Sequence, residues 1–310
     1  MCQGPLLVVM NAGSGSNSTA EVREQIAAVF NEAGRAHEFL LVEDASRLAE
    51  TAREAVRKAC AQGGAVVAAG GDGTINGIAQ VVLGSGCVFG VLPQGTFNYF
   101  GRDHGIPQDT ESAARALLRA RIEPIQVGMV NDRVFLVNAS LGLYPKLLED
   151  RELFKQQFGR SRLVAMLSGL RTLLLERRQL HLSIELDGHT GSLRTPTLFV
   201  GNNALQLQRL GFDEAAKVEQ GQLVAIAVRP IGNLQMLGLI LRGALGRLGE
   251  AEHVTSLAFR KLTVHTRGQR AIKVGTDGEI RHLRSPLVFS LAPEPLKLLV
   301  PLPEDRVKVE

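Results

Sequence analysis

The segment Gly70-Gly71-Asp72-Gly73-Thr74 constrains the fold more than any other part of the chain. It follows an apolar run at residues 65–69 that is typical of a buried strand, and it precedes a helix-like stretch at 75–83. Glycines at such a turn let backbone N–H groups approach phosphate oxygens, and the helix N-terminus adds partial positive charge. The segment therefore predicts a nucleotide-phosphate site, in which Thr74 offers a hydroxyl and Asp72 holds Mg²⁺ or a hydroxyl. An ordinary strand-to-helix turn is the alternative.

The first 124 residues alternate between strand-like and helix-like patterns. Apolar runs of strand length occur at residues 6–9, 39–42, 65–69 and 88–92. The stretches between them have helical periodicity, as in Val22, Ile26, Val29 and Phe30. This alternation predicts a nucleotide-binding α/β domain over residues 1–124, built on a doubly wound, largely parallel sheet.

Two more polar loops, at residues 11–15 and 93–98, follow predicted strands of this domain. Because the loops after parallel strands gather at one edge of the sheet, we expect both to line one crevice with residues 70–74. The phosphate-binding lysine of a P-loop is missing, so the sequence disfavours a P-loop NTPase. The predicted nucleotide-binding residues are Asn11, Ser14, Gly15, Gly70, Gly71, Asp72, Gly73, Thr74, Gly95, Thr96 and Asn98.

From about residue 125 the pattern changes to short apolar runs separated by Gly, Asp and Asn. Such runs occupy residues 134–138, 180–186, 197–200, 223–228, 262–266 and 287–291, which is the spacing of an all-β domain. Two helical stretches, 161–178 and 234–248, lie between them. These features predict a β-rich, sandwich-like second domain over residues 125–310. The apolar tail at 296–303 is expected to pack back on the first domain.

Cysteine usage and the apolar segments bear on the compartment. The cysteines at positions 2, 60 and 87 have neither zinc-ligand nor C-x-x-C spacing, which predicts reduced thiols in a cytoplasmic protein. No basic segment precedes the apolar residues 5–10, so no secretory signal is predicted. The apolar stretches 163–175 and 234–245 are too short to span a membrane and each contains an arginine.

Charge is distributed unevenly along the chain. Residues 126–310 carry 25 Lys and Arg against 18 Asp and Glu, whereas residues 1–125 carry 10 against 13. The basic part suits either an anionic membrane surface or a solvated, arginine-rich surface. Aromatic residues make up only 5% of the chain and Trp is absent, so no nucleic-acid partner is predicted.

In their order along the chain, the three loops resemble the diacylglycerol kinase catalytic family. This family includes bacterial lipid kinases and sphingosine kinases, and it is distantly similar to NAD kinases. The glycine-rich segment 70–74 is flanked by an Asn-x-x-Ser-Gly loop and a Pro-x-Gly-Thr-x-Asn loop, and residues 138–142, 201–203 and 277–279 also look like family motifs. The resemblance implies that ATP phosphorylates a lipid hydroxyl in a cleft between an α/β domain and a β-rich domain.

By this resemblance, Asp277 and Glu279 supply the catalytic base. One carboxylate that accepts the proton of the substrate hydroxyl, oriented by a second two residues away, suits phosphoryl transfer. Taken on its residues alone, the segment 276–279 also suits a hairpin turn. Asp72 is a competing candidate for the base, or for a ligand of ATP-bound Mg²⁺.

The chain departs from the family pattern at three places. Gly77 stands where the family has Glu, Tyr99 stands where it has Asp after Asn98, and residues 219–225 lack the aspartates of the family's structural Mg²⁺ site. We therefore predict no structural metal at residues 219–225. The departures also leave room for a non-enzymatic nucleotide-binding protein.

The segment 160–178 carries leucines on one helical side and arginines around them. Such a helix rests on an anionic bilayer, or it packs on a sheet with its arginines reaching water. The sequence leaves both interpretations open.

The sequence thus favours a lipid kinase with ATP and Mg²⁺ as cofactors and a lipid as its substrate. We expect it in the cytoplasm, with peripheral contact at the inner membrane surface. A soluble small-molecule or NAD-type kinase is the first alternative and a nucleotide-binding protein is the second. Whether the chain forms a homodimer stays open.

Overall fold

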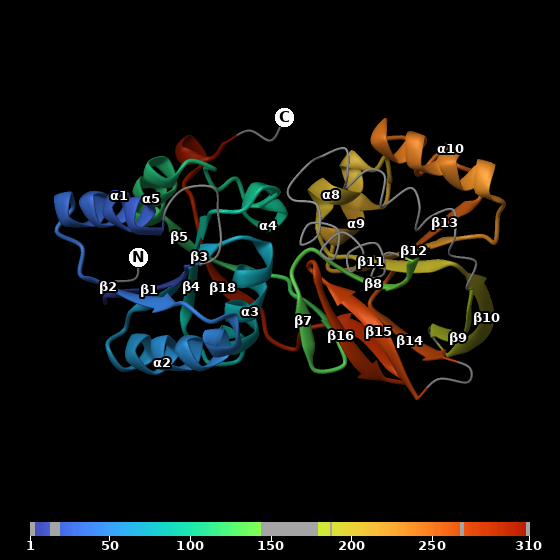
Figure 1. Ribbon diagram of the computed structural model, residues 1–310, viewed down its shortest axis with the longest axis horizontal. Coiled ribbons are helices and arrows are strands. Elements are labelled where there is room, and N and C mark those ends of the chain that lie inside the picture. Colours follow the sequence, from blue (N-terminus) through green and yellow to red (C-terminus); the bar gives the residue numbers. More distant parts are fainter. Residues whose placement is uncertain (1–3, 13–18, 144–178, 187, 267–269, 308–310) are drawn as a thin grey trace. The chain divides into compact units, whose positions relative to one another are not determined.

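A computed structural model describes residues 4–12, 19–143, 179–186, 188–266 and 270–307 (Figure 1). The chain forms two compact units. Unit 1 comprises Met1–Val127 together with Ala292–Glu310, and unit 2 comprises Gly128–Leu291. Among the described helices, none is both long enough and apolar enough to cross a membrane.

Unit 1 is built on one six-stranded sheet. Its strands lie in the order β2 (His37–Val42), β1 (Leu6–Asn11), β3 (Ala65–Gly70), β4 (Val88–Pro93), β18 (Leu296–Val300) and β5 (Arg121–Ile125). The first four are parallel to one another. β18 is parallel to β4 and antiparallel to β5, so a strand from the end of the chain lies inside the sheet of the first unit.

Helices cover both faces of this sheet. α1 (Thr19–Glu32) and α5 (Thr110–Arg119) lie on one face, and α2 (Leu48–Ala61) and α3 (Asp72–Val82) lie on the other (Figure 1). A 3₁₀ turn, η1 (Ala45–Arg47), leads into α2, α4 (Tyr99–Asp103) follows β4, and η2 (Pro303–Asp305) follows β18. Because both faces are covered, every residue of β3 is buried. The predicted α/β fold with a largely parallel sheet is confirmed.

Unit 2 contains two six-stranded, antiparallel sheets. The first has the order β10 (His189–Thr195), β9 (Leu180–Leu186), β14 (Lys261–Thr266), β17 (Leu287–Leu291), β6 (Gly128–Val130) and β7 (Arg133–Phe135). The second has the order β13 (Val254–Phe259), β12 (Leu223–Val228), β11 (Thr197–Gly201), β8 (Asn138–Gly142), β15 (Ala271–Thr276) and β16 (Glu279–Arg284). The predicted run 134–138 is therefore split, since β7 ends at Phe135 and β8 begins at Asn138 in the other sheet.

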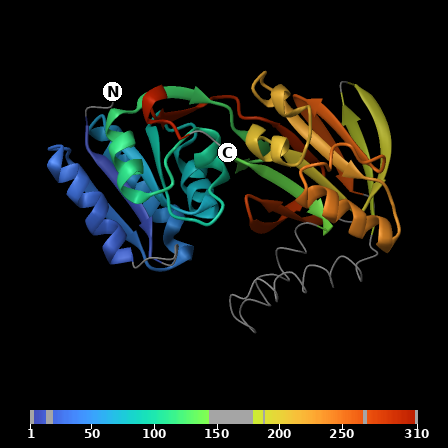
Figure 2. The same cartoon turned by 90° about the horizontal axis from the view of Figure 1, so that it is seen from above.

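One apolar core joins the two sheets of unit 2 into a sandwich. It contains Phe289 and Val264 from the first sheet and Leu141 and Val274 from the second. The second sheet is also covered on its outer face, where α8 (Ala204–Arg209) and α9 (Ala215–Val218) pack on it (Figures 1 and 2). The predicted β-rich second domain is confirmed. The predicted helix at 161–178 lies outside the described residues.

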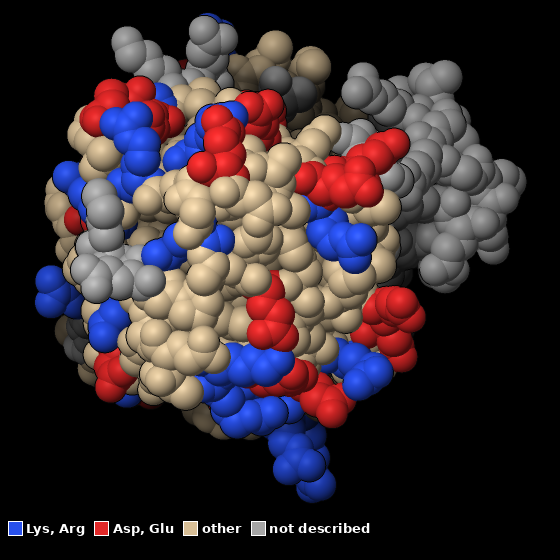
Figure 3. Space-filling model, turned by 90° about the vertical axis from the view of Figure 1, so that its left-hand side faces the viewer, with Lys and Arg blue, Asp and Glu red and all other residues tan. Residues whose placement is uncertain are grey.

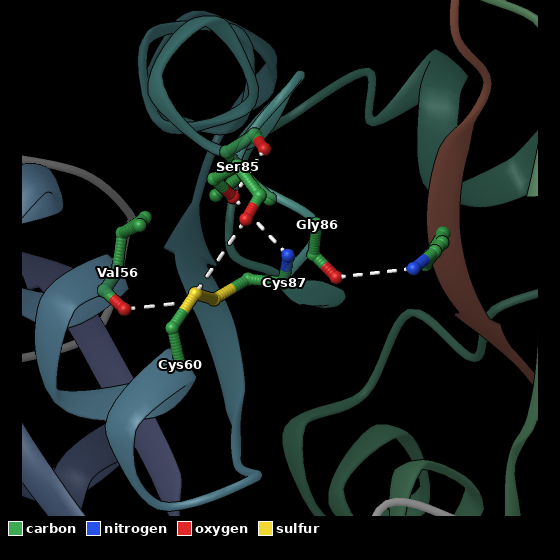
Figure 4. The surroundings of a disulfide bond; sticks show 7 residues. Val56, Cys60, Ser85, Gly86 and Cys87 are labelled. Carbon is green, nitrogen blue, oxygen red and sulfur yellow. Dashed lines mark hydrogen bonds between the residues drawn. A yellow bond between two sulfur atoms is a disulfide. The ribbon is translucent and has the colours of Figure 1, made fainter.

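A disulfide bond joins Cys60, in the last turn of α2, to Cys87, just before β4 (Figure 4). The Sγ of Cys87 lies 3.5 Å from the Val56 carbonyl oxygen, and the Cys87 N–H donates to the Ser85 hydroxyl at 3.2 Å. The prediction of reduced thiols was wrong for this pair. The two cysteines are 27 residues apart in the sequence, and only the tertiary fold brings the end of α2 next to the residue that precedes β4.

We expect the disulfide to stabilise unit 1 by about 3 kcal/mol, because closing a loop of this length restricts the unfolded chain. Urea unfolding of the wild type with and without a reductant measures this difference. The variant carrying both Cys60→Ser and Cys87→Ser should unfold like the reduced wild type, and reductant should not change it. A wild-type curve that is unaffected by reductant would contradict the prediction.

Candidate functional site

The carboxyl ends of β1, β3 and β4 meet at one edge of the unit 1 sheet. β1 lies between β2 and β3, so the strand order reverses at this point. Open α/β sheets bind ligands outside the strand ends at such a reversal. Asn11 ends β1, Gly70 ends β3 and Pro93 ends β4, so all three predicted nucleotide loops start at this edge.

The loops after β3 and β4 approach each other closely, backbone to backbone. A Cβ added at Gly95 would lie 2.8 Å from the Cα of Gly71 and 2.7 Å from Oδ1 of Asn98. The N–H of Gln94 also donates to the carbonyl of Gly70 at 2.9 Å. Position 95 therefore needs glycine, and the contact brings together two segments that the sequence assigned to one site.

Asn98 shapes the second of these loops from inside. Its φ of 49° is in the left-handed region, which Asn tolerates better than most residues. Its Oδ1 accepts from the N–H of Gly95, and its Nδ2 donates to the Gly95 carbonyl and to Oε1 of Gln108, all at 2.9 Å. Both amide hydrogens are used within the protein, so Asn98 positions Gly95 in this structure. Its direct contact with a nucleotide stays a prediction.

Asp72 is the first residue of α3 and contacts the start of α4. Its Oδ1 accepts from the backbone N–H of Phe100 at 3.4 Å. Burial raises the pKa of Asp72, and the backbone N–H groups of residues 98–100 lower it by less. The carboxylate anion is thus less favourable here than in water, and a cation bound beside it would stabilise it.

The remaining predicted residues of unit 1 take different positions. Nδ2 of Asn11 donates to Oγ1 of Thr74 at 3.2 Å, which ties the loop after β1 to α3. α3 begins at Asp72, three residues before the predicted start, so Gly73 and Thr74 belong to its first turn. Thr96 is exposed. Ser14 and Gly15 lie outside the described residues.

The loop after β4 carries a stacked aromatic pair that the sequence did not predict. The rings of Phe97 and Tyr99 stack with centroids 5.9 Å apart and planes at 6°. The side chain of Phe97 is half exposed. The sequence pattern that could have predicted this pair is the presence of two aromatic residues, Phe97 and Tyr99, just after Gly95-Thr96.

In unit 2, Asp277 and Gly278 form the two-residue turn of the β15–β16 hairpin. Their φ values are 47° and 91°, as a type I′ turn requires. The hairpin expected from residues 276–279 is therefore present. The turn points the Asp277 carboxylate away from solvent, and the residue is only 8% exposed.

The buried Asp277 carboxylate accepts three backbone hydrogen bonds. Its Oδ2 accepts from Leu136 at 2.6 Å, and its Oδ1 accepts from Val137 at 2.9 Å and from Asn138 at 2.8 Å. Leu136 and Val137 carry the chain from β7 in one sheet to β8 in the other, so they lie outside both sheet ladders. Asp277 supplies the acceptors that these amides need. These three bonds indicate a positioning role for Asp277.

Asn202 satisfies the carbonyl groups of the same crossing segment. Its backbone N–H donates to the Val137 carbonyl at 2.8 Å, and its Nδ2 donates to the Leu136 carbonyl at 3.1 Å. Nδ2 of Asn138 donates to Oε1 of Gln206 at 3.1 Å. Because β8 lies between β11 and β15, the motif segments 138–142, 201–203 and 277–279 are neighbours in one sheet. The roles of residues 136, 137 and 206 were not found from the sequence.

Glu279, the first residue of β16, is more accessible. Its side chain is 39% exposed, and its Oε2 accepts from Nη2 of Arg281 at 2.9 Å. The two carboxylates of the hairpin thus lie in different environments. Asp277 is held by backbone amides, whereas Glu279 remains open to a ligand from solvent.

Residues 5–130 match the sequence pattern of the family described as "Diacylglycerol kinase catalytic domain". This part of the chain is therefore similar to the diacylglycerol kinase catalytic family. The matched residues include all three loops at the edge of the unit 1 sheet. The predicted family resemblance is therefore confirmed.

Two relatives are named as lipid kinases. "Probable lipid kinase YegS-like" of Klebsiella pneumoniae (strain 342) is 43% identical over 79 residues, which cover 25% of this chain and 27% of the relative. The protein of the same name from Pseudomonas aeruginosa (strain UCBPP-PA14) is 38% identical over 151 residues, which cover 47% of each chain. The matches therefore span from about a quarter to about half the length of these relatives.

A solved structure shares the fold over nearly the whole chain. It is described as "Crystal structure of a putative diacylglycerol kinase from Bacillus anthracis str. Sterne". The TM-score is 0.74, the identity is 18%, and the superposition covers 97% of this chain and 98% of the other. At this identity, the similarity establishes the fold of both units and nothing further.

One departure from the kinase family pattern has a packing reason. A Cβ at Gly77 in α3 would lie 2.7 Å from Cδ2 of Leu48, the first residue of α2. The Leu48 side chain therefore occupies the space in which a glutamate at position 77 would begin. At the second departure, Tyr99 stacks on Phe97 as described above.

Among the described residues, no three His, Cys, Asp or Glu side chains gather closely enough to hold a metal by themselves. Mg²⁺ does not require such a cluster, since it commonly binds through one or two carboxylates, substrate phosphates and water. Asp72, with its raised pKa and its place at the loop edge, fits that arrangement.

We expect Asp277→Asn to lower the free energy of unfolding by about 2–4 kcal/mol, because an amide cannot accept all three backbone hydrogen bonds at once. Chemical denaturation measures the loss. Glu279→Gln is the matched control on the same hairpin and should unfold like the wild type within about 0.5 kcal/mol. Equal stability of both variants would contradict the positioning role of Asp277.

Proposed function

We propose that the protein is an ATP-dependent lipid kinase that transfers the γ-phosphate of ATP to a lipid hydroxyl. The observation that carries this proposal is the joined pair of glycine loops in the part of the chain similar to the diacylglycerol kinase catalytic family, where Gly71 and Gly95 meet at the strand-reversal edge. The N–H of Gly95 is engaged by Asn98, so the N–H groups that would meet phosphate oxygens are those in the first turn of α3, at Gly73 and Thr74, where a helix has no intrahelical acceptors. Asn11, Thr74 and Thr96 would add polar side-chain contacts.

We propose that Asp72 holds Mg²⁺ together with the ATP phosphates. Burial makes its anion unfavourable, and a divalent cation would offset that cost. When bound, Mg²⁺ neutralises charge on the phosphates during transfer. Asp72 also binds the N–H of Phe100, so it couples the metal position to the loop that contains Gly95 and Asn98.

We propose that Glu279 is the catalytic base and that Asp277 positions it. A base must have an oxygen open to the substrate hydroxyl, and Glu279 is the exposed member of the pair. Asp277 fixes the turn through its bonds to residues 136–138 and thereby sets where β16 begins. The ion pair with Arg281 would restrict the rotamers of Glu279.

The proposal of a lipid acceptor draws on the relatives named as lipid kinases. We propose that the reaction takes place at the surface of the membrane that holds the lipid, on the side where ATP is supplied. A soluble acceptor and nucleotide binding without transfer are the competing outcomes.

The deciding experiment follows labelled γ-phosphate from ATP, with Mg²⁺, into mixed micelles of diacylglycerol, monoacylglycerol, phosphatidylglycerol, ceramide or sphingosine. Label in one of these lipids would support the proposal and name the substrate class. Transfer of the label to NAD or another soluble acceptor would contradict the lipid kinase and identify a soluble-substrate kinase. Binding of ATP with no transfer at all would favour a nucleotide-responsive binding protein.

Glu279→Gln should lower kcat for the accepted lipid by about 10²–10⁴-fold, because the amide cannot take the proton of the hydroxyl. The KM for ATP and the unfolding curve should change little. Arg281→Gln serves as the control, since it removes the ion pair and keeps the carboxylate. A wild-type kcat in the Glu279→Gln variant would show that Glu279 is not the catalytic base.

Asp72→Asn should weaken Mg²⁺-dependent ATP binding by at least tenfold, because it removes the proposed carboxylate ligand and keeps the size of the side chain. Titration calorimetry with ATP at several Mg²⁺ concentrations measures this effect. Metal-free binding of ATP should change less. If both affinities fall together, Asp72 acts on the loop and does not hold the metal.

A further inference from the structure

The helix α10 (Asn233–Ala244) of unit 2 carries an apolar face that points to solvent. Leu234 is 85% exposed, Leu241 is 62% exposed, and Leu245, which directly follows the helix, is 66% exposed. Leu237 and Ile240 are also exposed. The spacing of 234, 237, 241 and 245 places these leucines on one side of a helix, so they form a continuous stripe. We call these four residues the leucine stripe.

The opposite side of α10 attaches the helix to unit 2. Leu239 is buried and belongs to a small core with Val228 and Ala251, against which Met236 also packs. Nε2 of Gln235 also lies 3.3 Å from a ring nitrogen of His253. α10 is thus anchored by residues outside the leucine stripe. A helix at a protein surface normally presents polar residues on its outer side, and this one presents leucines.

The segment that carries the stripe is basic. Residues 229–249 contain Arg229, Arg242 and Arg247 and no Asp or Glu, and all three arginines are exposed; two exposed acidic residues, Glu250 and Glu252, follow this segment. The guanidinium of Arg242 donates to the backbone carbonyl of Glu250 at 3.4 Å, and no ion pair of Arg242 occurs among the described residues. Figure 3 shows a different pattern on another face of the molecule, where basic and acidic side chains are interspersed.

We propose that α10 is an interfacial helix that docks on an anionic phospholipid bilayer. The leucine stripe would enter the boundary between headgroups and acyl chains, and the three arginines would bind the anionic headgroups. Exposed leucines on a helix with arginines and no acidic residue within residues 229–249 have the composition of such helices. The centre of a protein interface is instead enriched in aromatic residues, and this stripe has none. The choice of a bilayer as the occupant rests on the proposed lipid kinase function.

The test is co-sedimentation of the full chain with vesicles of phosphatidylcholine, with and without phosphatidylglycerol. The wild type should bind the anionic vesicles more tightly. Replacing Leu234 and Leu241 together by Gln should weaken that binding at least tenfold. Replacing Arg242 and Arg247 by Gln should reduce the preference for anionic vesicles by roughly fivefold for each arginine.

The matched control replaces two exposed apolar residues of unit 1, Leu41 and Ile122, by Gln. It should bind vesicles like the wild type. Unchanged circular dichroism of each variant shows that folding is preserved. Equal vesicle binding by the wild type and the leucine variant, or the absence of binding by the wild type, would overturn the proposal. A wild-type dimer that the leucine variant abolishes, without vesicle binding, would assign the stripe to a second copy of the chain and also overturn it.

A kinase assay separates this proposal from the proposed function. With lipid dispersed in detergent micelles, the leucine variant should keep the wild-type rate, since no bilayer has to be reached. With the same lipid in vesicles, its rate should fall in parallel with its binding. A wild type that binds vesicles through the stripe yet phosphorylates no lipid would refute the proposed reaction and leave the docking helix standing.

Discussion

The bonds between the Asp277 carboxylate and three backbone amides hold unit 2 together where its chain changes sheets. A sandwich needs segments that leave one sheet and enter the other, and the peptide groups of such a segment lose their ladder partners. At residues 136–137 the partners come from Asp277 for the N–H groups and from Asn202 for the carbonyls. The same bonds fix the hairpin on which Glu279 lies. The residue that satisfies the amides of the crossing segment therefore also positions a candidate base.

Unit 1 meets a comparable requirement with glycine. Its two central loops can share one site only if their backbones nearly touch, and a single methyl group at position 95 would separate them. Asn98 keeps this approach by closing the loop on itself in a left-handed conformation that few residues accept. In both units, therefore, a polar residue of a motif, Asn98 in unit 1 and Asp277 in unit 2, uses its side chain to hold the backbone beside the site.

The fold was largely predictable because strands such as β1, β3 and β12 are apolar along most of their length. The run at 223–228 predicts β12 to the residue, since alternate side chains enter two different cores. Some strands were missed. β5, β10, β13 and β16 are edge strands with many polar residues, whereas the interior strands β6 and β15 were missed because β6 has only three residues and β15 contains Lys273, Gly275 and Thr276. The motif residues were found, but their bonding was not, because Asp277 and its amide partners are about 140 residues apart. The Cys60–Cys87 pairing depended on packing in the same way.

The position of β18 between β4 and β5 has a consequence for the order of assembly on the ribosome. β5 is complete at residue 125, but it has no sheet neighbour until residue 300 has been made. At typical synthesis rates of roughly 5–20 residues per second, that interval lasts about 9–35 seconds. During this time all of unit 2 emerges and can form its sandwich, while β4 keeps an open edge. The sheet of the nascent first unit therefore lacks β18, and the exposed edge of β4 can bind a chaperone or pair with a wrong strand until β18 has been synthesised.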